Sequence, residues 1–193
     1  MRVDVESLAI ERGELRLFEN LSFTAAPGAH VALTGANGTG KTSLLRALAG
    51  FLAPSAGTIR FSIEEPAAQT HFLGHRDGLK GALEVREHLM FWRDLFGGAD
   101  DPAEALARVG LTRVADLPAR ALSAGQSRRL SLARLLVAER PLWLLDEPAA
   151  GLDTAGKALL ADLIAAHRMT GGVVIAAVHE PLGAPDVDVR LGA

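Results

Sequence analysis

Hydrophobic positions along the chain fall into short apolar runs separated by longer segments with helical spacing. The short runs predict β-strands at residues 3–10, 14–18, 21–25, 31–33, 58–63, 69–73, 142–145 and 173–178. The longer segments predict helices at residues 41–49, within 84–116, from 123 onward and at 154–169. Because buried strands alternate with helices, we expect an α/β fold with a mainly parallel core sheet. An antiparallel β piece at the N-terminus and a small helical subdomain at about 76–140 complete the prediction.

A glycine-rich segment lies between the apolar strand at 31–33 and the helix that starts at Lys41. It matches the phosphate-loop pattern G-x-x-x-x-G-K-[ST] with Gly35, Ala36, Asn37, Gly38, Thr39, Gly40, Lys41 and Thr42. Small residues let backbone N–H groups wrap a phosphate at the start of a helix. We expect Lys41 to reach the β- and γ-phosphates and the Thr42 hydroxyl to bind Mg²⁺. A chance glycine-rich turn is the alternative, but the strand–loop–helix context favours a nucleotide with Mg²⁺. The loop alone does not separate kinases, GTPases and motor or transport ATPases.

The apolar run at 142–145 ends in two acidic residues, Asp146 and Glu147. At the end of a central strand, Asp146 would lie beside the phosphate loop and bind Mg²⁺. Glu147 would orient a water molecule for attack on the γ-phosphate and accept its proton. Solvated acids at a strand end are the simpler alternative, but the upstream phosphate loop favours catalysis.

A second helix start that can receive an anion is predicted at residues 122–126, Leu-Ser-Ala-Gly-Gln. Ser123 is a natural N-cap, and Gly125 leaves room for a close approach to the backbone. By itself this segment also fits a well-capped amphipathic helix.

These segments resemble, in kind and order, the motifs of the ATP-binding subunits of ABC transporters. GANGTGKT resembles their Walker A loop, LSAGQ their signature segment and LWLLDE their Walker B strand; AGLD at 150–153 resembles their D-loop, and His179 after VVIAAV their switch histidine. The resemblance implies one ABC ATPase domain over residues 1–193, a P-loop NTPase of the ABC type. Its catalytic residues would be Glu147, His179 and Lys41.

The resemblance also implies a head-to-tail dimer of two copies of the chain. Each ATP would lie between the Walker A loop of one copy and Ser123, Gly125 and Gln126 of the other. His179 would contact the γ-phosphate, and Asp153 would help the two subunits communicate.

Two positions depart from the family pattern. Arg12 stands near the place where the family usually has an aromatic residue that stacks on adenine, and the chain has no tyrosine. We expect the Arg12 guanidinium to cover the base, although loosely held adenine is the alternative. His75 stands where the family usually has a glutamine that touches Mg²⁺ and the transport partner.

The segments LGHRDGLK and PLWLLDEP narrow the resemblance to the haem-exporter ATPases of bacterial cytochrome c maturation. This resemblance implies an ATP-hydrolysing subunit that helps release a haem-loaded chaperone. It further implies integral-membrane permease partners and a peripheral position on the cytoplasmic face of the bacterial inner membrane. There are two alternatives. The chain could be the ATPase of another small-substrate ABC transporter, or a soluble ABC ATPase that takes no part in transport. No direct haem binding is expected, because other subunits of that system handle haem.

Composition restricts the function further. The net charge of −3 argues against a basic nucleic-acid-binding face, and the absence of cysteine excludes disulfides and thiolate metal sites. The longest apolar run, 173–178, is far shorter than the roughly 20 residues of a membrane-spanning helix. A membrane partner would therefore dock on the surface, and the helix at 84–96 is the predicted place. It has two apolar stripes, formed by Val85, Leu89, Trp92 and Phe96 and by His88, Phe91 and Leu95. One stripe can pack on the core and leave the other for a partner, and a thoroughly buried helix is an equally good alternative.

Overall fold

The computed structural model describes residues 1–13, 15–179 and 182–192, and the chain divides into two compact units. The first unit contains Met1–Gly74, Pro141–Pro148 and the chain from Leu163 onward. The second contains His75–Arg140 and Ala149–Asp162, so residues 76–140 lie within it.

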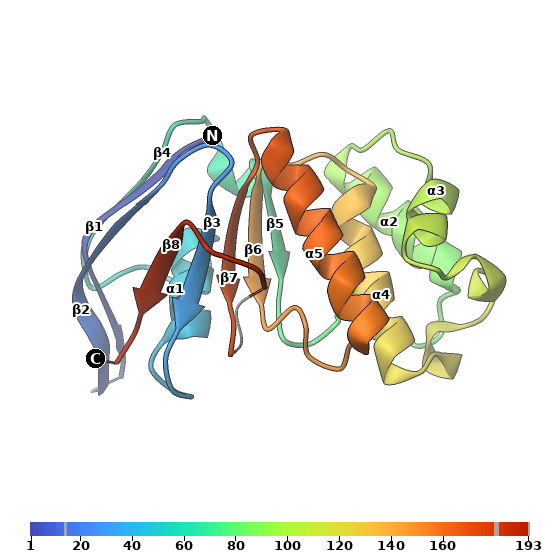
Figure 1. The fold of residues 1–193 in the computed structure, drawn as a ribbon, viewed down its shortest axis with the longest axis horizontal. Helices are drawn as coiled ribbons and strands as arrows, with labels where there is room; N and C mark the ends of the chain where they lie inside the picture. Colours follow the sequence, from blue (N-terminus) through green and yellow to red (C-terminus); the bar gives the residue numbers. More distant parts are fainter. Residues whose placement is uncertain (14, 180–181, 193) are drawn as a thin grey trace. The chain divides into compact units, whose positions relative to one another are not determined.

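A five-stranded parallel sheet forms the centre of the first unit (Figure 1), with the strand order β5-β6-β7-β3-β8. Its strands are β3 (His30–Thr34), β5 (Thr70–Leu73), β6 (Leu142–Asp146), β7 (Val173–Ala177) and β8 (Val187–Arg190). Every residue of β6 and β7 is buried, as expected for strands covered on both faces. The predicted parallel core sheet is confirmed. The edge strand β8 was not predicted, although Val187 and Val189 alternate with polar residues there.

A three-stranded antiparallel sheet completes the first unit, with the order β2-β1-β4. Its strands are β1 (Val3–Arg12), β2 (Leu15–Ala25) and β4 (Ala56–Phe61). The strands predicted at 14–18 and 21–25 are in fact the single strand β2. Asn20 has a φ of 54° within that strand, and the pairing with β1 is irregular there, so the polar interruption is absorbed by a bulge.

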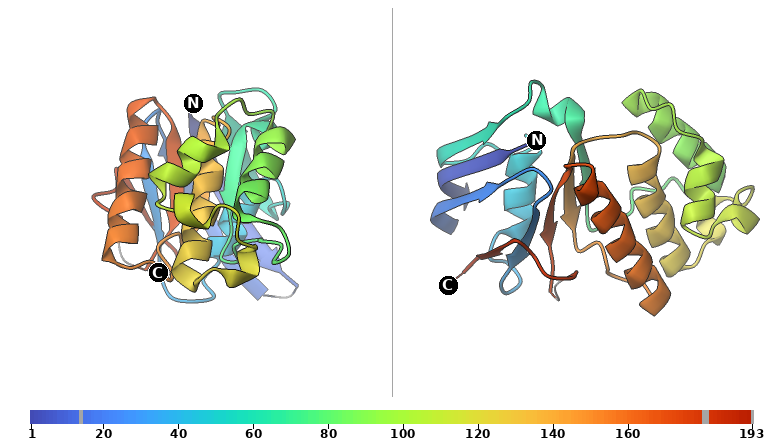
Figure 2. Two further views of the ribbon diagram at one scale, coloured as in Figure 1. Left: turned by 90° about the vertical axis from the view of Figure 1, so that its right-hand side faces the viewer. Right: turned by 45° about the horizontal axis from the view of Figure 1, so that its top comes forward.

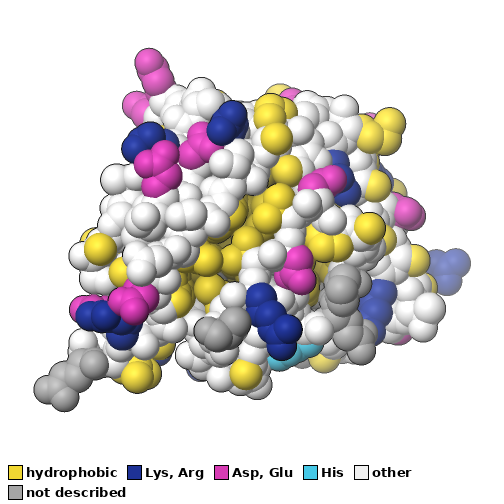
Figure 3. All heavy atoms as spheres, turned by 60° about the vertical axis from the view of Figure 1, so that its left-hand side comes forward, with side chains coloured by type: hydrophobic (Ala, Val, Ile, Leu, Met, Phe, Trp, Pro, Cys, Tyr) yellow, Lys and Arg dark blue, Asp and Glu magenta, His cyan; other side chains and the backbone are white. Residues whose placement is uncertain are grey.

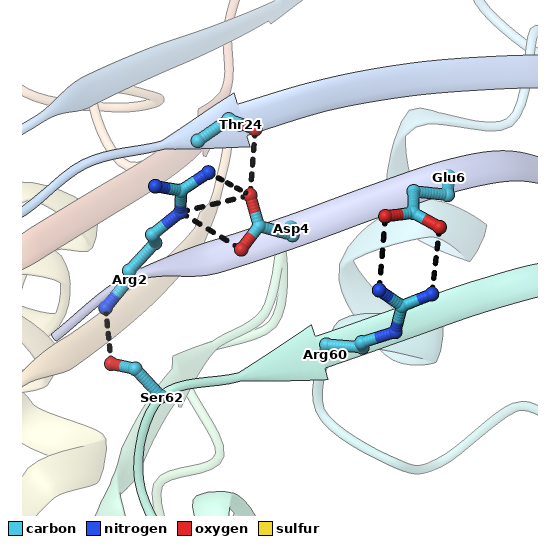
Figure 4. Close-up of polar contacts among 6 residues, drawn as sticks. All are labelled: Arg2, Asp4, Glu6, Thr24, Arg60 and Ser62. Atoms are coloured by element: carbon cyan, nitrogen blue, oxygen red, sulfur yellow. Dashed lines mark hydrogen bonds and ion pairs between the residues drawn. The ribbon is translucent and has the colours of Figure 1, made fainter.

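Cross-strand pairs cover one face of the antiparallel sheet (Figure 4). The Arg60 guanidinium on β4 donates to both Glu6 carboxylate oxygens on β1, at 2.7 and 3.1 Å. Asp4 on β1 accepts a cross-strand hydrogen bond from the Thr24 hydroxyl on β2, and it also accepts a local one from Arg2, two residues earlier in the chain. Exposed pairs of this kind contribute little stability, but they favour the observed strand register.

The opposite face of the antiparallel sheet and the parallel sheet share one apolar core. It includes Val5, Leu8 and Ile10 from β1 together with Val31 and Leu33 from β3, all almost fully buried. On the side of the molecule that carries the antiparallel sheet, hydrophobic side chains reach the surface in a band between charged groups (Figure 3). The partly buried residues packed against this core include Leu17, Phe18, Leu21, Phe23 and Val187.

Helix α1 (Lys41–Leu48) follows the phosphate loop and packs on β6 and β7. Gly40, with a φ of 103°, precedes it, and the helix ends before Gly50. A short 3₁₀ turn at Pro66–Gln69 leads into β5. Helix α5 (Thr154–Met169) begins in the second unit and ends in the first.

The second unit is helical (Figure 2). It has its own hydrophobic core. Its helices are α2 (Val85–Phe96), α3 (Pro102–Arg108) and α4 (Ala124–Ala133), with 3₁₀ turns at Thr112–Val114, Ala119–Ala121 and Arg134–Leu136. A break at Gly97 and Gly98 divides the predicted helical region 84–116. Gly97 ends α2 with a φ of 67°, and a β-carbon on Gly98 would lie 2.0 Å from the Val137 carbonyl oxygen. Glycine is therefore required where the backbone passes so close.

Over the part of the chain that the structure describes, no helix has both the length and the apolar character to span a bilayer.

Candidate nucleotide-binding site

The phosphate loop, residues 35–42, connects β3 to α1 in the first unit. Gly35, Gly38 and Gly40 have φ values of 129°, 84° and 103°, which L side chains rarely adopt. Lys41 is buried, with 7% of its surface exposed, and its ammonium donates to the carbonyl oxygens of Gly35 and Ala36 at 2.7 and 2.8 Å. The loop therefore curls around the Lys41 ammonium at the start of a helix, as anion-binding loops do.

The end of the chain packs against this loop. A β-carbon on Gly35 would lie 2.3 Å from the Leu191 carbonyl oxygen, and one on Gly192 would lie 2.5 Å from the Thr39 Cγ2 atom. The Leu191 N–H donates to the Thr34 carbonyl oxygen, 2.9 Å away, which extends the β3–β8 pairing to the loop. These contacts were not predicted, because no local pattern connects the two segments.

Phe18 on β2 is a second unpredicted neighbour of the phosphate loop. A β-carbon on Gly40 would lie 2.9 Å from the Phe18 ring, so the ring lies directly against the last glycine of the loop. The sequence offers only one aromatic residue in a strand of alternating pattern, which is too little to predict this contact.

Thr42, in the first turn of α1, meets Asp146 at the carboxyl end of β6, as predicted. The Thr42 hydroxyl lies 3.1 and 2.9 Å from the two Asp146 carboxylate oxygens, and Asp146 is almost fully buried. Hydroxyl and carboxylate oxygens are hard ligands that suit Mg²⁺. Among the described residues, no group of three or more histidine or acidic side chains could hold a metal by itself. The pair therefore fits an ion that keeps water and phosphate oxygens as further ligands.

Glu147 and His179 also lie together, at the ends of the neighbouring strands β6 and β7. The His179 Nε2 atom is 3.1 Å from the Glu147 Oε1 atom. Glu147 has a φ of 49°, and its N–H donates to the Ala177 carbonyl oxygen at 3.0 Å. A left-handed backbone costs a glutamate about 1–2 kcal/mol, and such strain often marks a functional position.

The second unit holds the signature segment at residues 122–126, at the start of α4. Ser123 is the predicted N-cap: its hydroxyl oxygen accepts from the Gln126 N–H at 3.2 Å, and the Gln126 side chain accepts from the Ser123 N–H at 2.9 Å. This capping box holds the turn rigidly, and the Ser123 hydroxyl still has its own hydrogen to donate. The carbonyl oxygen of Gly151 lies 3.5 Å from the β-carbon position of Gly125, so the D-loop touches the signature segment.

Asp153 ends the D-loop, residues 150–153, and caps α5 in the second unit. Its Oδ1 atom accepts from the Gly156 N–H at 2.7 Å and from the Arg129 guanidinium at 2.7 Å. The Gly156 N–H, followed by Arg129, lowers the pKa of Asp153 below its usual value. The carboxylate is therefore held in its charged form.

Arg12 and His75 are both exposed. Arg12 ends β1 at the tip of the hairpin, opposite Leu15, in the unit that contains the phosphate loop. His75 is the first residue of the second unit, whereas Thr42 and Asp146 belong to the first. The predicted contacts of Arg12 with the base and of His75 with Mg²⁺ stay predictions.

The parallel sheet, the phosphate loop after β3 and the acidic end of β6, together with a separate helical unit that carries a capped signature segment, define a P-loop ATPase of the ABC type. The family model described as ABC transporter matches residues 18–150. The chain belongs to the ABC transporter family, and it is the ATPase of an ABC-type transporter.

Two relatives with similar sequences share one name. A protein of Rhodopseudomonas palustris (strain HaA2), named cytochrome c biogenesis ATP-binding export protein CcmA, is 51% identical over 200 residues, covering 100% of this chain and 99% of the relative. A protein of the same name from Nitrobacter winogradskyi is 50% identical and covers 100% of this chain and 98% of the relative. These names agree with the resemblance to haem-exporter ATPases of cytochrome c maturation that the sequence motifs indicated.

A solved structure confirms the predicted fold. An ABC transporter ATP-binding protein from Pyrococcus furiosus has a TM-score of 0.87 and 24% sequence identity, and the match covers 99% of this chain and 98% of that one.

Proposed function

We propose that this chain is the ATP-hydrolysing subunit of a haem export system for bacterial cytochrome c biogenesis, in which it drives release of a haem-loaded chaperone. All 193 residues work as one ABC ATPase domain. The names of relatives at about half identity over the full length support the choice of system. Another small-substrate ABC transporter remains the second candidate.

The ATPase chemistry rests on one observation: Thr42–Asp146 and Glu147–His179 lie side by side at the carboxyl end of the parallel sheet. The loop N–H groups of residues 35–42 and the Lys41 ammonium bind the phosphates. Thr42 and Asp146 would hold Mg²⁺, whose charge would offset the negative charge that develops on the phosphate oxygens. Glu147 orients the attacking water and accepts its proton, while His179 fixes the Glu147 carboxylate and contacts the γ-phosphate.

The second half of each site comes from another copy of the chain. The capped start of α4 offers Ser123, Gly125 and Gln126 to the γ-phosphate of the facing subunit, where the helix start and the Ser123 O–H both favour an anion. Asp153 communicates between the two sites from the D-loop. Two head-to-tail copies therefore enclose two ATP molecules.

Two further contacts complete the proposed site. The planar guanidinium of Arg12 covers the base, a contact that a cation can make with an aromatic ring. His75 replaces the family's glutamine next to Mg²⁺ and the transport partner, and it links the metal to the membrane subunits.

Helix α2 is the proposed docking surface for integral-membrane permease subunits at the cytoplasmic face of the bacterial inner membrane. Met90, Phe91 and Leu95 are 43%, 47% and 59% exposed on one side of α2, although Val85 and Leu89 are buried. His88, which belongs to the same predicted stripe as Phe91, is buried and bonded to the Lys80 carbonyl oxygen. The exposed apolar side of α2 therefore differs from the predicted stripe, because it includes Met90 and lacks His88, and it is apolar enough for a protein partner.

Replacement of Glu147 by glutamine tests the ATPase mechanism. Because the amide cannot accept the proton, we expect hydrolysis to fall about 10²–10⁴-fold while ATP binding is retained. Steady-state hydrolysis and equilibrium binding of a fluorescent ATP analogue measure the two effects. Unchanged turnover in the purified variant would remove Glu147 from the mechanism.

Purification of the tagged Glu147→Gln chain from its native membranes, with ATP present, tests the transport system. Recovery of integral-membrane subunits of cytochrome c maturation is the expected result. Recovery of an unrelated permease would keep the ATPase and reject the haem system, and purely soluble partners would reject transport. The Lys41→Ala variant, which should lose ATP binding, is the control for nucleotide-dependent recovery.

A further inference from the structure

Within the second unit, an ion pair joins the signature helix α4 to the D-loop, and no sequence motif predicts it. Arg129, on the second turn of α4, donates from Nη2 to the Asp153 Oδ1 atom at 2.7 Å. The side chain of Arg129 is 24% exposed, whereas that of Asp153 is 69% exposed. A second contact lies nearby, since the Gly151 carbonyl oxygen approaches the β-carbon position of Gly125 to 3.5 Å.

The surroundings of Arg129 restrict where its guanidinium can lie. The Nη1 atom is 3.6 Å from the β-carbon position of Gly110, in the turn that follows α3. Gly110 has a φ of 73°, so this turn favours glycine and leaves space for the guanidinium. A planar side chain held on one side by a turn loses less entropy when it forms an ion pair than a freely exposed one.

Asp153 uses one oxygen for two purposes. The same Oδ1 atom that meets Arg129 also caps α5 by accepting the Gly156 N–H at 2.7 Å. A β-carbon on Gly156 would lie 3.0 Å from Oδ1, so glycine permits this close approach. The carboxylate therefore ties the D-loop to α4 through Arg129 and to α5 through Gly156.

We propose that Arg129 is a positioning residue that holds the D-loop against the signature helix, so that both segments meet the nucleotide of the facing subunit as one body. This inference rests on the proposed function, because the facing subunit is part of it. Arg129 contacts no nucleotide in this scheme. It acts only through Asp153 and the segment that Asp153 ends.

A double-mutant cycle tests the proposal. The variants are Arg129→Gln, Asp153→Asn and the double variant, each in the Glu147→Gln chain, where bound ATP persists. Asparagine keeps an oxygen that can accept the Gly156 N–H, so Asp153→Asn removes the charge and leaves the cap. Analytical ultracentrifugation at increasing ATP gives the concentration needed for half-maximal dimerisation.

We expect each single variant to raise that ATP concentration about tenfold, and the double variant to be no worse than either single one, because both remove the same interaction. Arg129→Lys, which keeps the charge, should recover part of the loss. Arg108→Gln, a matched change of an exposed arginine on α3, should have no effect. Melting temperatures are measured in parallel. Equal values for the variants and the parent would exclude unfolding as the cause of weaker dimerisation.

Additive effects in the cycle, or an Arg129→Gln chain that dimerises like its parent, would overturn the positioning role and leave the proposed function intact. Failure of the parent Glu147→Gln chain to dimerise with ATP would overturn the proposed dimer and, with it, the role of Arg129. The parent is measured first, so the two failures are distinguishable.

Discussion

His167 shows how a single half-buried side chain becomes sensitive to pH. Its imidazole stacks on the Trp143 indole with ring centroids 4.0 Å apart and an angle of 8° between the planes. A β-carbon on Gly172 would lie 2.2 Å from the His167 Nε2 atom, so the ring packs tightly on the backbone. Burial disfavours the charged imidazolium and lowers the pKa of His167 from 6.5 to about 4.

The lowered pKa of His167 predicts a loss of stability in acid. Between pH 6.5 and about 4 the unfolded chain binds a proton that the folded chain does not, so the free energy of unfolding falls as the pH is lowered through this range. Above pH 6.5 the imidazole is neutral in both states, so there His167 no longer makes the free energy of unfolding depend on pH. Urea unfolding at several pH values measures the slope in the wild type and in His167→Phe.

The phenylalanine variant keeps an aromatic ring against Trp143 but has no proton to bind, so its stability should depend less steeply on pH across the same window. Carboxylates contribute equally to both proteins, and the difference between them isolates His167. Identical slopes would show that His167 titrates normally in the folded chain.

At the scale of elements, the phosphate loop depends on a strand far away in the sequence. Strand β8 pairs with β3 through Val31 and Val187, and its continuation at Leu191 fills the space behind Gly35. The loop and helix α1 were predictable because G-x-x-x-x-G-K-[ST] has a fixed local geometry. Strand β8 was not, because four residues with only two apolar positions are too short a signal.

Gly35→Ala tests whether the packing of Leu191 behind the phosphate loop matters for nucleotide binding. An added methyl would lie 2.3 Å from the Leu191 carbonyl oxygen, so either the loop or β8 must move. Overpacking of this kind costs about 1–3 kcal/mol, and we expect ATP affinity to fall at least about tenfold. Isothermal titration calorimetry with ATP measures the loss.

The matched control is Gly38→Ala, in the same loop. Gly38 also has a positive φ, of 84°, but nothing lies within 4 Å of its β-carbon position. This variant carries the backbone strain without the collision, so it should bind ATP more tightly than Gly35→Ala. Equal losses would assign the whole effect to backbone conformation.

At the scale of the whole molecule, the chain needs surfaces for partners as well as a site for ATP. The first unit carries the proposed groups for phosphate binding and hydrolysis, and the second carries the signature segment, the D-loop and the exposed apolar side of α2. In the proposed function, the hydrolytic groups and the docking surface for the permease therefore lie on different units. A change on the exposed side of α2 should weaken membrane association and leave ATP binding unchanged.

Phe91→Asp should reduce the fraction of the chain that pellets with membranes about tenfold or more, since a charge would replace an anchor of the docking surface. ATP binding should be unchanged. Met169→Asp is the matched control, because Met169 is 88% exposed at the end of α5 and lies outside the proposed surface. Equal membrane binding of the Phe91 variant and the control would reject α2 as the docking site.

The sequence by itself determined the class of fold and the local chemistry. Contiguous motifs such as residues 35–42 and 142–147 dictate a loop, a strand end and the side chains on them, because their geometry depends on near neighbours. Tertiary structure alone decided the contacts between distant segments: Phe18 on Gly40, Leu191 behind Gly35 and Arg129 on Asp153. Each of these joins residues brought close only by packing and strand pairing, and no short sequence window contains both partners.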